Sequence, residues 1–163
     1  MPNNFLDELA QRFAASGYHV DRDLVFQDRT FAVAAKRQFF NWLRFGFIEP
    51  TFLVSELANL DSLSVGEYVS SCFRNAVLHR GAIFRMRLPV HLFIFPVAVG
   101  RQVEAEVRDS SREEAPEKQP GAFLFPVIYD LESGAAHYFQ KTPRWGSANY
   151  KLARSLVTPL FGS

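Results

Sequence analysis

Apolar residues recur with helical spacing close to the N-terminus of the chain. Phe5, Leu9 and Phe13 fall on one face of a segment that Asn4 can cap and that Gly17 can end. An amphipathic helix is therefore predicted between Asn4 and Gly17, with its apolar face turned toward the core.

Two further segments carry the start and stop signals of helices. Residues 64–67 form a capping box, in which the Ser and Glu side chains each accept a hydrogen bond from an amide at the helix start. Gly81 is placed to end this helix. A last helix is predicted to have Ser147 as its cap and to end at Thr158-Pro159, because the residue before a proline avoids the helical region. The apolar stripe of the middle helix consists of Val65, Val69, Cys72, Phe73 and Ala76.

Alternation of apolar and polar residues predicts strands after the first helix. A turn at Asp28-Arg29 separates residues 18–26 from residues 30–33, so these two segments are expected to form a hairpin. Residues 36–46 are ambiguous, because some of their apolar residues have helical spacing while the many aromatic rings favour strands, and strands are predicted. Residues 47–57 are expected to be extended, and Pro50 inside them indicates an edge strand or a bulge.

The phrase Phe-x-Phe-Pro-Val occurs twice at a constant offset, in HLFIFPVAVG (91–100) and in GAFLFPVIYD (121–130). Continuous apolar runs of this kind suit strands that are covered on both faces, so both segments are predicted to be interior strands. Each proline removes one hydrogen-bond donor from the ladder. If the strands are neighbours, the two prolines can lie at matching depths and leave a gap in the ladder. Chance recurrence of a short apolar phrase is the favoured explanation, and pairing of the two copies is the alternative.

The remaining segments complete a predicted α+β fold. Residues 108–120 are charged and contain no aliphatic side chain larger than Ala, so a mobile surface loop is expected there. A turn at residues 130–134 and a short strand at residues 136–139 precede the last helix. The predicted order is α-β-β-β-α-β-β-β-α, a single domain over residues 1–163. Its single-layer, mixed, mainly antiparallel sheet is expected to be flanked by about three helices.

Composition narrows the classes of function. A formal net charge of +1 argues against strong binding to nucleic acid or to a membrane surface on bulk charge alone. The single cysteine, Cys72, forbids an internal disulfide, and it is expected to be a small buried hydrophobic residue. The first residues do not resemble a signal peptide, and the longest apolar run is too short to span a bilayer. A cytoplasmic protein without a membrane partner is predicted.

The sequence motifs of common enzymes are not found in the chain. The order helix, three strands, helix, strand resembles that of restriction-endonuclease-like domains, but their acidic strand and Glu-x-Lys signature are missing. The nearest match is Ala34-Ala35-Lys36, with Asp21 or Asp23 upstream. The four histidines do not have the spacing of metal ligands. No catalytic residue, metal or cofactor is therefore predicted, although a site assembled from distant residues stays open.

Two basic aromatic segments are the candidate binding surfaces. The first lies in HYFQKTPRWGSANYKLAR, where cations alternate with rings just before a helix start, which suits an anion. Its candidate residues are Lys141, Arg144, Trp145, Ser147, Lys151 and Arg154. The second surface comprises Lys36, Arg37, Trp42 and Arg44. The alternative is that Trp145 anchors the core, Ser147 caps its own helix and the cations are solvated.

The leading expectation is a non-catalytic protein-interaction or scaffold module. A second copy of the chain or another protein would cover its excess Phe surface. The alternative is a protein that binds an anionic ligand, either nucleic acid or a phosphorylated small molecule, through the C-terminal segment. A degenerate nuclease-like domain is a further alternative.

Overall fold

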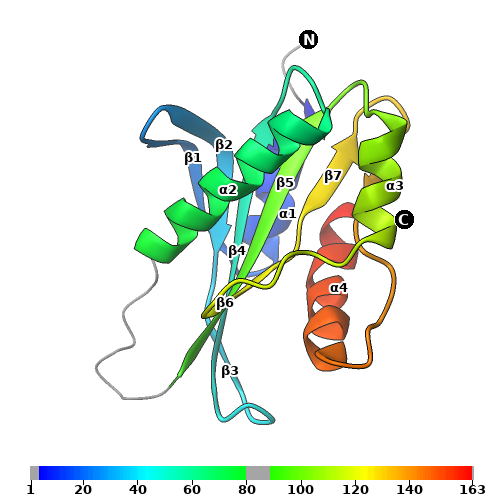
Figure 1. The fold of residues 1–163 in the computed structure, drawn as a ribbon. Coiled ribbons are helices and arrows are strands. Elements are labelled where there is room, and N and C mark those ends of the chain that lie inside the picture. Colours follow the sequence, from blue (N-terminus) through cyan, green and yellow to red (C-terminus); the bar gives the residue numbers. More distant parts are fainter. Residues whose placement is uncertain (1–3, 80–88, 163) are drawn as a thin grey trace.

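The computed structural model describes residues 4–79 and 89–162, and it contains a mixed sheet of 8 strands (Figure 1). Four helices pack on the sheet, one more than the predicted three. In chain order the elements are α1 (Asn4–Ala15), β1 (His19–Phe26), β2 (Arg29–Lys36), β3 (Phe39–Asn41), β4 (Gly46–Glu56), α2 (Ser62–Leu78), β5 (Val90–Gly100), α3 (Ala105–Glu113), β6 (Ala122–Leu124), β7 (Val127–Asp130), β8 (Ala135–His137) and α4 (Ser147–Phe161).

The sheet has a parallel interior and antiparallel margins. Its strand order is β1-β2-β4-β5-β7-β8, with β3 paired to β4 and β6 paired to β5. Strands β4, β5 and β7 run parallel, because the helices α2 and α3 connect them as crossovers. The prediction of a mixed sheet is confirmed. The prediction of a mainly antiparallel sheet missed the long parallel ladder between β4 and β5.

Helices cover both faces of the sheet. Figure 1 shows α2 in front of the strands and α1 behind them. On one face, Leu9 and Phe13 of α1 and Phe161 of α4 belong to a single apolar cluster. On the other face, Tyr68 of α2 and Val107 of α3 belong to a second cluster. The two-sided cover explains why β4 and β5 are buried along almost their whole length.

The repeated phrase pairs with itself in register. In the parallel ladders Phe93 lies opposite Phe123, and Val97 lies opposite Val127. Pro96 continues β5, whereas the equivalent strand is interrupted between β6 and β7 at residues 125–126. The expected interior strands are therefore confirmed. The two copies are also neighbours, which the sequence left open, and only the second copy is interrupted at its proline. Rings from the two copies also pack, with Phe93 and Phe123 centroids 5.1 Å apart.

Within residues 36–46 the predicted strands are found in part: β3 covers Phe39–Asn41, and a turn at residues 42–45 leads into the central strand β4. Pro50 does not mark an edge, since β4 lies between β2 and β5. It falls where the β3 ladder ends and the β2 ladder has not yet begun, and the Arg37 amide donates to its carbonyl at 3.3 Å. A proline is tolerated there because the neighbouring antiparallel ladder is already interrupted.

The helix starts differ from the predicted caps. Helix α2 is capped by Asp61, whose carboxylate accepts from the Ser64 amide at 2.8 Å, so Ser64 is not the cap. The predicted stop at Gly81 lies outside the described residues. Helix α4 begins after Gly146, which has a φ of +79°, and Ser147 is its first residue. The helix also continues past Pro159, because Leu160 and Phe161 are buried against the core and hold the last turn.

Part of the expected mobile loop is the helix α3. Nine residues, Ala105–Glu113, are helical although only Val107 among them is buried. One apolar side chain is too weak a signal to mark an amphipathic face in a sequence of charged and polar residues. The prediction of a loop over residues 108–120 was therefore wrong for its first half.

Candidate functional site

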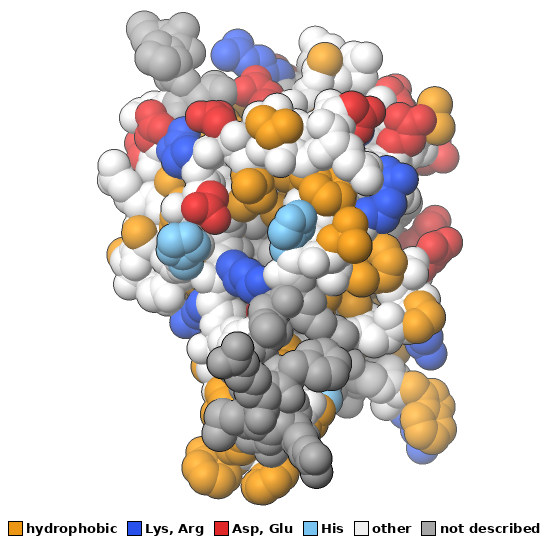
Figure 2. Space-filling model, turned by 90° about the vertical axis from the view of Figure 1, so that its left-hand side faces the viewer, with side chains coloured by type: hydrophobic (Ala, Val, Ile, Leu, Met, Phe, Trp, Pro, Cys, Tyr) orange, Lys and Arg blue, Asp and Glu red, His pale blue; other side chains and the backbone are white. Residues whose placement is uncertain are grey.

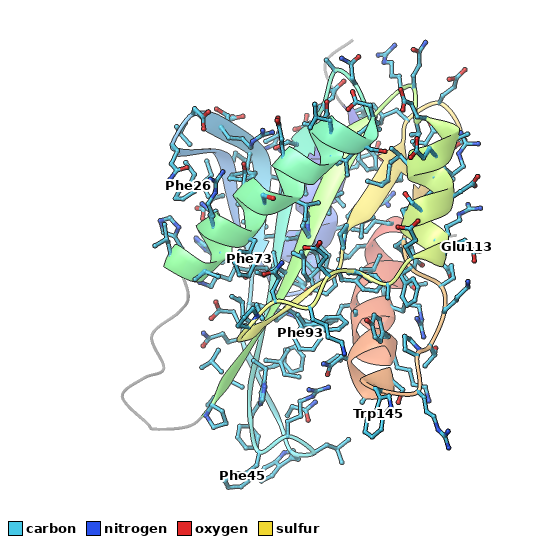
Figure 3. The ribbon with its side chains drawn as sticks, in the orientation of Figure 1. Phe26, Phe45, Phe73, Phe93, Glu113 and Trp145 are labelled. Carbon is cyan, nitrogen blue, oxygen red and sulfur yellow. The ribbon has the colours of Figure 1, made fainter. Side chains whose placement is uncertain are left out.

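A pocket of about 790 Å³ opens at one end of the sheet. Figure 1 shows β3 at this end. Its walls come from the β3–β4 turn, the first residues of β5, residues 116–124 and the first turn of α4. Figure 3 shows Phe45 and Trp145 at this end of the molecule, with Phe93 lying between them and deeper in. Segments that are far apart in the sequence therefore meet at one cavity.

The floor of the pocket is apolar. Phe93 and Phe123 line it side by side, because the parallel pairing of β5 with β6 places these two residues opposite each other. Tyr150 of α4 packs edge-on against Phe123, with ring centroids 5.0 Å apart. Val90 and Leu92 complete the apolar lining from β5. A floor of packed rings can bind an apolar group with little loss of side-chain freedom.

Arg44 supplies a positive charge at the pocket wall. Its guanidinium carbon lies 5.7 Å from the centroid of the Phe93 ring, and one guanidinium nitrogen donates to the side-chain carbonyl of Asn149. Partial burial lowers the pKa of Arg44, since charge is less favourable away from water. Within the described residues no carboxylate forms an ion pair with Arg44. The wall thus carries a cation whose charge no described acid compensates.

The first turn of α4 also faces this cavity. Gly146 precedes the helix in the left-handed region, which glycine adopts at little cost, and it lines the pocket with Asn149. No side chain caps the helix start. The Asn149 amide donates back to the Gly146 carbonyl at 2.9 Å. The positive end of the helix dipole therefore lies beside Arg44 without a carboxylate cap.

Tyr150 places a hydroxyl at the pocket. The residue is only 5% exposed, and its burial raises the pKa of the phenol. The hydroxyl makes no hydrogen bond to any residue that the structure describes. Tyr150 is one of the residues that line the pocket.

Four large apolar side chains are exposed around the pocket, and we call them the aromatic end. Trp42 is 80% exposed, Leu43 99%, Phe45 65% and Trp145 84%. Figure 2 shows hydrophobic side chains at the lower end of the molecule, on the β3–β4 turn. The ring of Phe40 contacts both Trp42 and Phe45, with centroids 4.8 and 6.0 Å apart, and so supports the turn from inside. Ring packing therefore holds the turn residues of the aromatic end in place.

One residue from each of the two candidate surfaces lines the pocket. Arg44, from the second predicted surface, and Trp145, from the first, line the same pocket. Trp42 lies on the same turn as Arg44 but outside the lining. Trp145 is not a core anchor, since most of its surface faces solvent. Ser147 lies in the first turn of α4 outside the lining.

Most other predicted cations hold the fold together. Lys141 pairs with Glu113, and Arg154 donates to the Lys141 carbonyl at 2.9 Å. Lys36 contacts the carboxylate of Glu49 at 3.1 Å, and the side chain of Glu49 is fully buried.

Arg37 and two exposed cations also lie away from the pocket. The guanidinium of Arg37 lies 4.6 Å from the Tyr18 ring centroid and donates to the Ser16 carbonyl at 3.0 Å. Arg144 and Lys151 are exposed and do not line the pocket. The predicted residues therefore do not converge on one concave basic patch.

Several residues of the pocket were not predicted from the sequence to belong to a binding surface. His91, Phe93, Phe123, Asn149 and Tyr150 line the cavity, yet each resembles an ordinary strand or helix residue in the sequence. The repeated phrase was the one feature of the sequence that could have predicted part of this lining. If its two copies pair in register, Phe93 and Phe123 must lie side by side at the start of their strands.

The single cysteine and the metal-binding residue types are candidates for chemistry. Burial raises the pKa of the Cys72 thiol to about 12, so it is protonated near neutral pH and a poor nucleophile. This agrees with the expected buried hydrophobic role. Across residues 4–79 and 89–162, no group of three or more His, Cys, Asp or Glu side chains is arranged to hold a metal ion.

Comparison of the chain with protein-family models, with curated proteins and with solved structures found no match. None of the helices in the described part of the chain is both long and apolar enough to cross a membrane.

Proposed function

We propose that this protein is a non-catalytic binding module that docks another protein through its aromatic end. The observation that carries the proposal is the exposure of Trp42, Leu43, Phe45 and Trp145 around one apolar pocket. Exposed apolar groups of this size on neighbouring segments are characteristic of interaction surfaces. Trp and Phe are also enriched in the energetic centres of protein interfaces.

The rigidity of the surface supports the same proposal. Phe40 packs beneath Trp42 and Phe45, and Arg44 ties the turn to α4 through Asn149. A surface that is already ordered loses little conformational entropy when a partner covers it. The partner is either another protein or a second copy of this chain, and oligomeric state distinguishes these two cases.

The anionic ligand is the second candidate, and Arg44 favours it. Nucleic acid requires a track of several cations along its backbone. Lys36, Lys141 and Arg154 are engaged in contacts within the fold, so they support a track poorly. Arg44, which has no acidic partner among the described residues, lies at an apolar pocket, and this arrangement suits a small anionic group better. Binding that weakens steeply with added salt would favour nucleic acid instead.

A degenerate nuclease-like core remains a proposal about architecture alone. One helix, an antiparallel group of strands, a helix and a parallel strand follow one another in the chain, which is compatible with that analogy. Lys36 lies at the end of β2, as the Ala34-Ala35-Lys36 match requires, but its partner is the buried Glu49. Such an analogy carries no function without the site.

The proposal is tested by making the turn polar. The variant W42S/L43S/F45S removes three exposed apolar side chains, and V25S/L63S/L78S is the matched control, since Val25, Leu63 and Leu78 are also exposed but lie elsewhere. Each tagged protein is returned to an extract of its source cells and cross-linked, and the captured proteins are identified by mass spectrometry. Light scattering of each purified protein reports self-association.

Partners captured by the wild type and by the control, but lost with the turn variant, support the proposal. If self-association alone is lost, the partner is a second copy. The same partners on all three proteins, with unchanged mass in solution, would refute it.

A further inference from the structure

We propose that the pocket beside Arg44 binds the carboxyl-terminal residue of a partner protein, with the terminal carboxylate at Arg44 and an apolar last side chain on the Phe93 and Phe123 floor. This inference rests on the proposed function, because it names the part of the partner that the aromatic end receives. Capture of a chain terminus by backbone amides and a nearby cation is a known mode of peptide recognition.

The charge of the pocket selects an anion. Among the described residues that line it, Arg44 and Lys118 are cations and Glu117 is the one carboxylate. Glu117 and Lys118 are exposed on the coil after α3, whereas Arg44 is partly buried and lies over the Phe93 ring. The described residues give Arg44 a neutral partner, Asn149, and no acidic one. A partly desolvated cation without an acid is stabilised by an incoming negative group.

The hydrogen-bonding groups near Arg44 suit a carboxylate. The start of α4 has no side-chain cap, and the Tyr150 hydroxyl has no partner within the described residues. The Tyr150 hydroxyl can donate to an oxygen acceptor near the guanidinium. The amides of Asn149 and Tyr150 already bond to the Gly146 carbonyl, so the helix start contributes the positive end of its dipole. A single guanidinium matches a group with one negative charge. A phosphate dianion would leave charge uncompensated above a floor of Phe rings.

The walls require that the anion be attached to an apolar group. Phe93 and Phe123 form the floor, Tyr150 contacts Phe123, and Trp145 stands at the mouth. The volume of about 790 Å³ has room for a bulky side chain and the backbone that carries it. The distance of 5.7 Å between the Arg44 guanidinium and the Phe93 ring places charge and apolar floor next to each other.

The aromatic end favours a peptide over a free acid. Trp42, Leu43 and Phe45 are exposed next to the pocket but do not line it. A small acid bound in the cavity would leave these side chains in water. A chain that enters the pocket with its last residue continues outward, so its preceding residues can cover the turn.

Peptides with free and blocked ends test the inference directly. An array of peptides attached through their N-termini presents every combination of the last two residues, once as the free acid and once as the carboxamide, and labelled protein is bound to it. The selected peptides are then titrated into the W42F variant, in which Trp145 is the only Trp and reports from the pocket mouth. Apolar last residues are expected to be selected, with acids binding about tenfold tighter than amides.

Two variants and a control assign the contacts. R44Q should weaken binding of the selected acid about tenfold while leaving the amide unchanged. R144Q removes the same charge from an exposed position that does not line the pocket, and it should bind like the wild type. Y150F removes only the hydroxyl and is expected to weaken the acid a few fold. Thermal unfolding of each variant shows whether the fold is retained.

Equal binding of acids and amides, or selection without preference for an apolar last residue, would overturn the inference. Decanoate added to the same W42F protein separates the two sources of carboxylate. Binding of decanoate without selection of any peptide would also overturn it, because the ligand would then be a free acid. None of these results changes the capture experiment with W42S/L43S/F45S, which tests the docking surface. Failure of the docking proposal and failure of the proposal about the pocket ligand are therefore distinguishable.

Discussion

The guanidinium of Arg44 donates a hydrogen bond to the side-chain carbonyl of Asn149, and this contact joins the β3–β4 turn to the first turn of α4. The two residues are far apart in the chain, yet both line the same pocket. The geometry of the site therefore depends on a polar contact between two elements that the sheet alone does not connect.

Replacing Asn149 should loosen the turn. N149A removes the acceptor of Arg44 and leaves a partly buried cation without its partner, so unfolding free energy is expected to fall by about 1 kcal/mol. Amide hydrogen exchange of residues 41–46 should become faster while exchange in β5 stays unchanged. S155A, at an exposed position of the same helix, is the control. Equal exchange of the turn in N149A and wild type would show that the contact does not order it.

Two glycines should respond in opposite directions to alanine. Gly146 has a φ of +79°, and alanine there is strained, so G146A is expected to lower stability by about 1 kcal/mol. Gly66 lies within α2, and an added Cβ meets no atom within 4 Å, so G66A should raise stability by up to about 1 kcal/mol. Urea unfolding of both variants measures the two signs. A stable G146A would mean that α4 can start without the left-handed residue.

The buried thiol should make stability fall in alkaline solution. The pKa of Cys72 is raised from 9.0 to about 12, chiefly by burial. Below pH 9 both the folded and the unfolded chain keep the proton, so the stabilisation is fully present. Between pH 9 and about 12 the unfolded chain releases a proton that the folded chain retains, and stability declines.

The C72A variant isolates this effect from the tyrosines, which titrate in the same range. Its unfolding free energy should decline with pH less steeply than that of the wild type. The difference in slope corresponds to the release of at most one proton per molecule on unfolding. S70A changes an exposed residue of the same helix and should keep the wild-type slope. Identical slopes for C72A and wild type would contradict the assignment.

The sequence was most informative where the physical signal was strong and local. The long apolar phrases predicted interior strands, whereas the pairing of the two copies in register was a possibility that the sequence left open. The helix α3 gave no such signal, since Val107 is its only buried residue. The cap of α2 was misplaced because Asp61 and Ser64 both have N-cap side chains, and only the backbone conformation decides between them.

The candidate site was predictable only in part, for a related reason. Arg44 and Trp145 were chosen because basic and aromatic residues are unusual together in a short segment. Their meeting at one pocket depends on sheet order, which brings the β3–β4 turn near α4. Tyr150 and Phe123 resemble core residues in the sequence. Long-range pairing turns them into the lining of a cavity, and local pattern carries no information about that pairing.

The in-register pairing of the repeated phrase has a consequence for how the chain avoids misfolding. Phe93 packs on Phe123, and Phe95 lies 6.0 Å from Phe125, so equal letters face each other across the ladder. A shift of one copy by a single residue would turn its rings to the opposite face of the sheet. A shift by two residues would place a proline, which has no N–H, opposite a carbonyl that needs a hydrogen-bond donor. The repeated sequence thus disfavours pairing of the two strands in any other register.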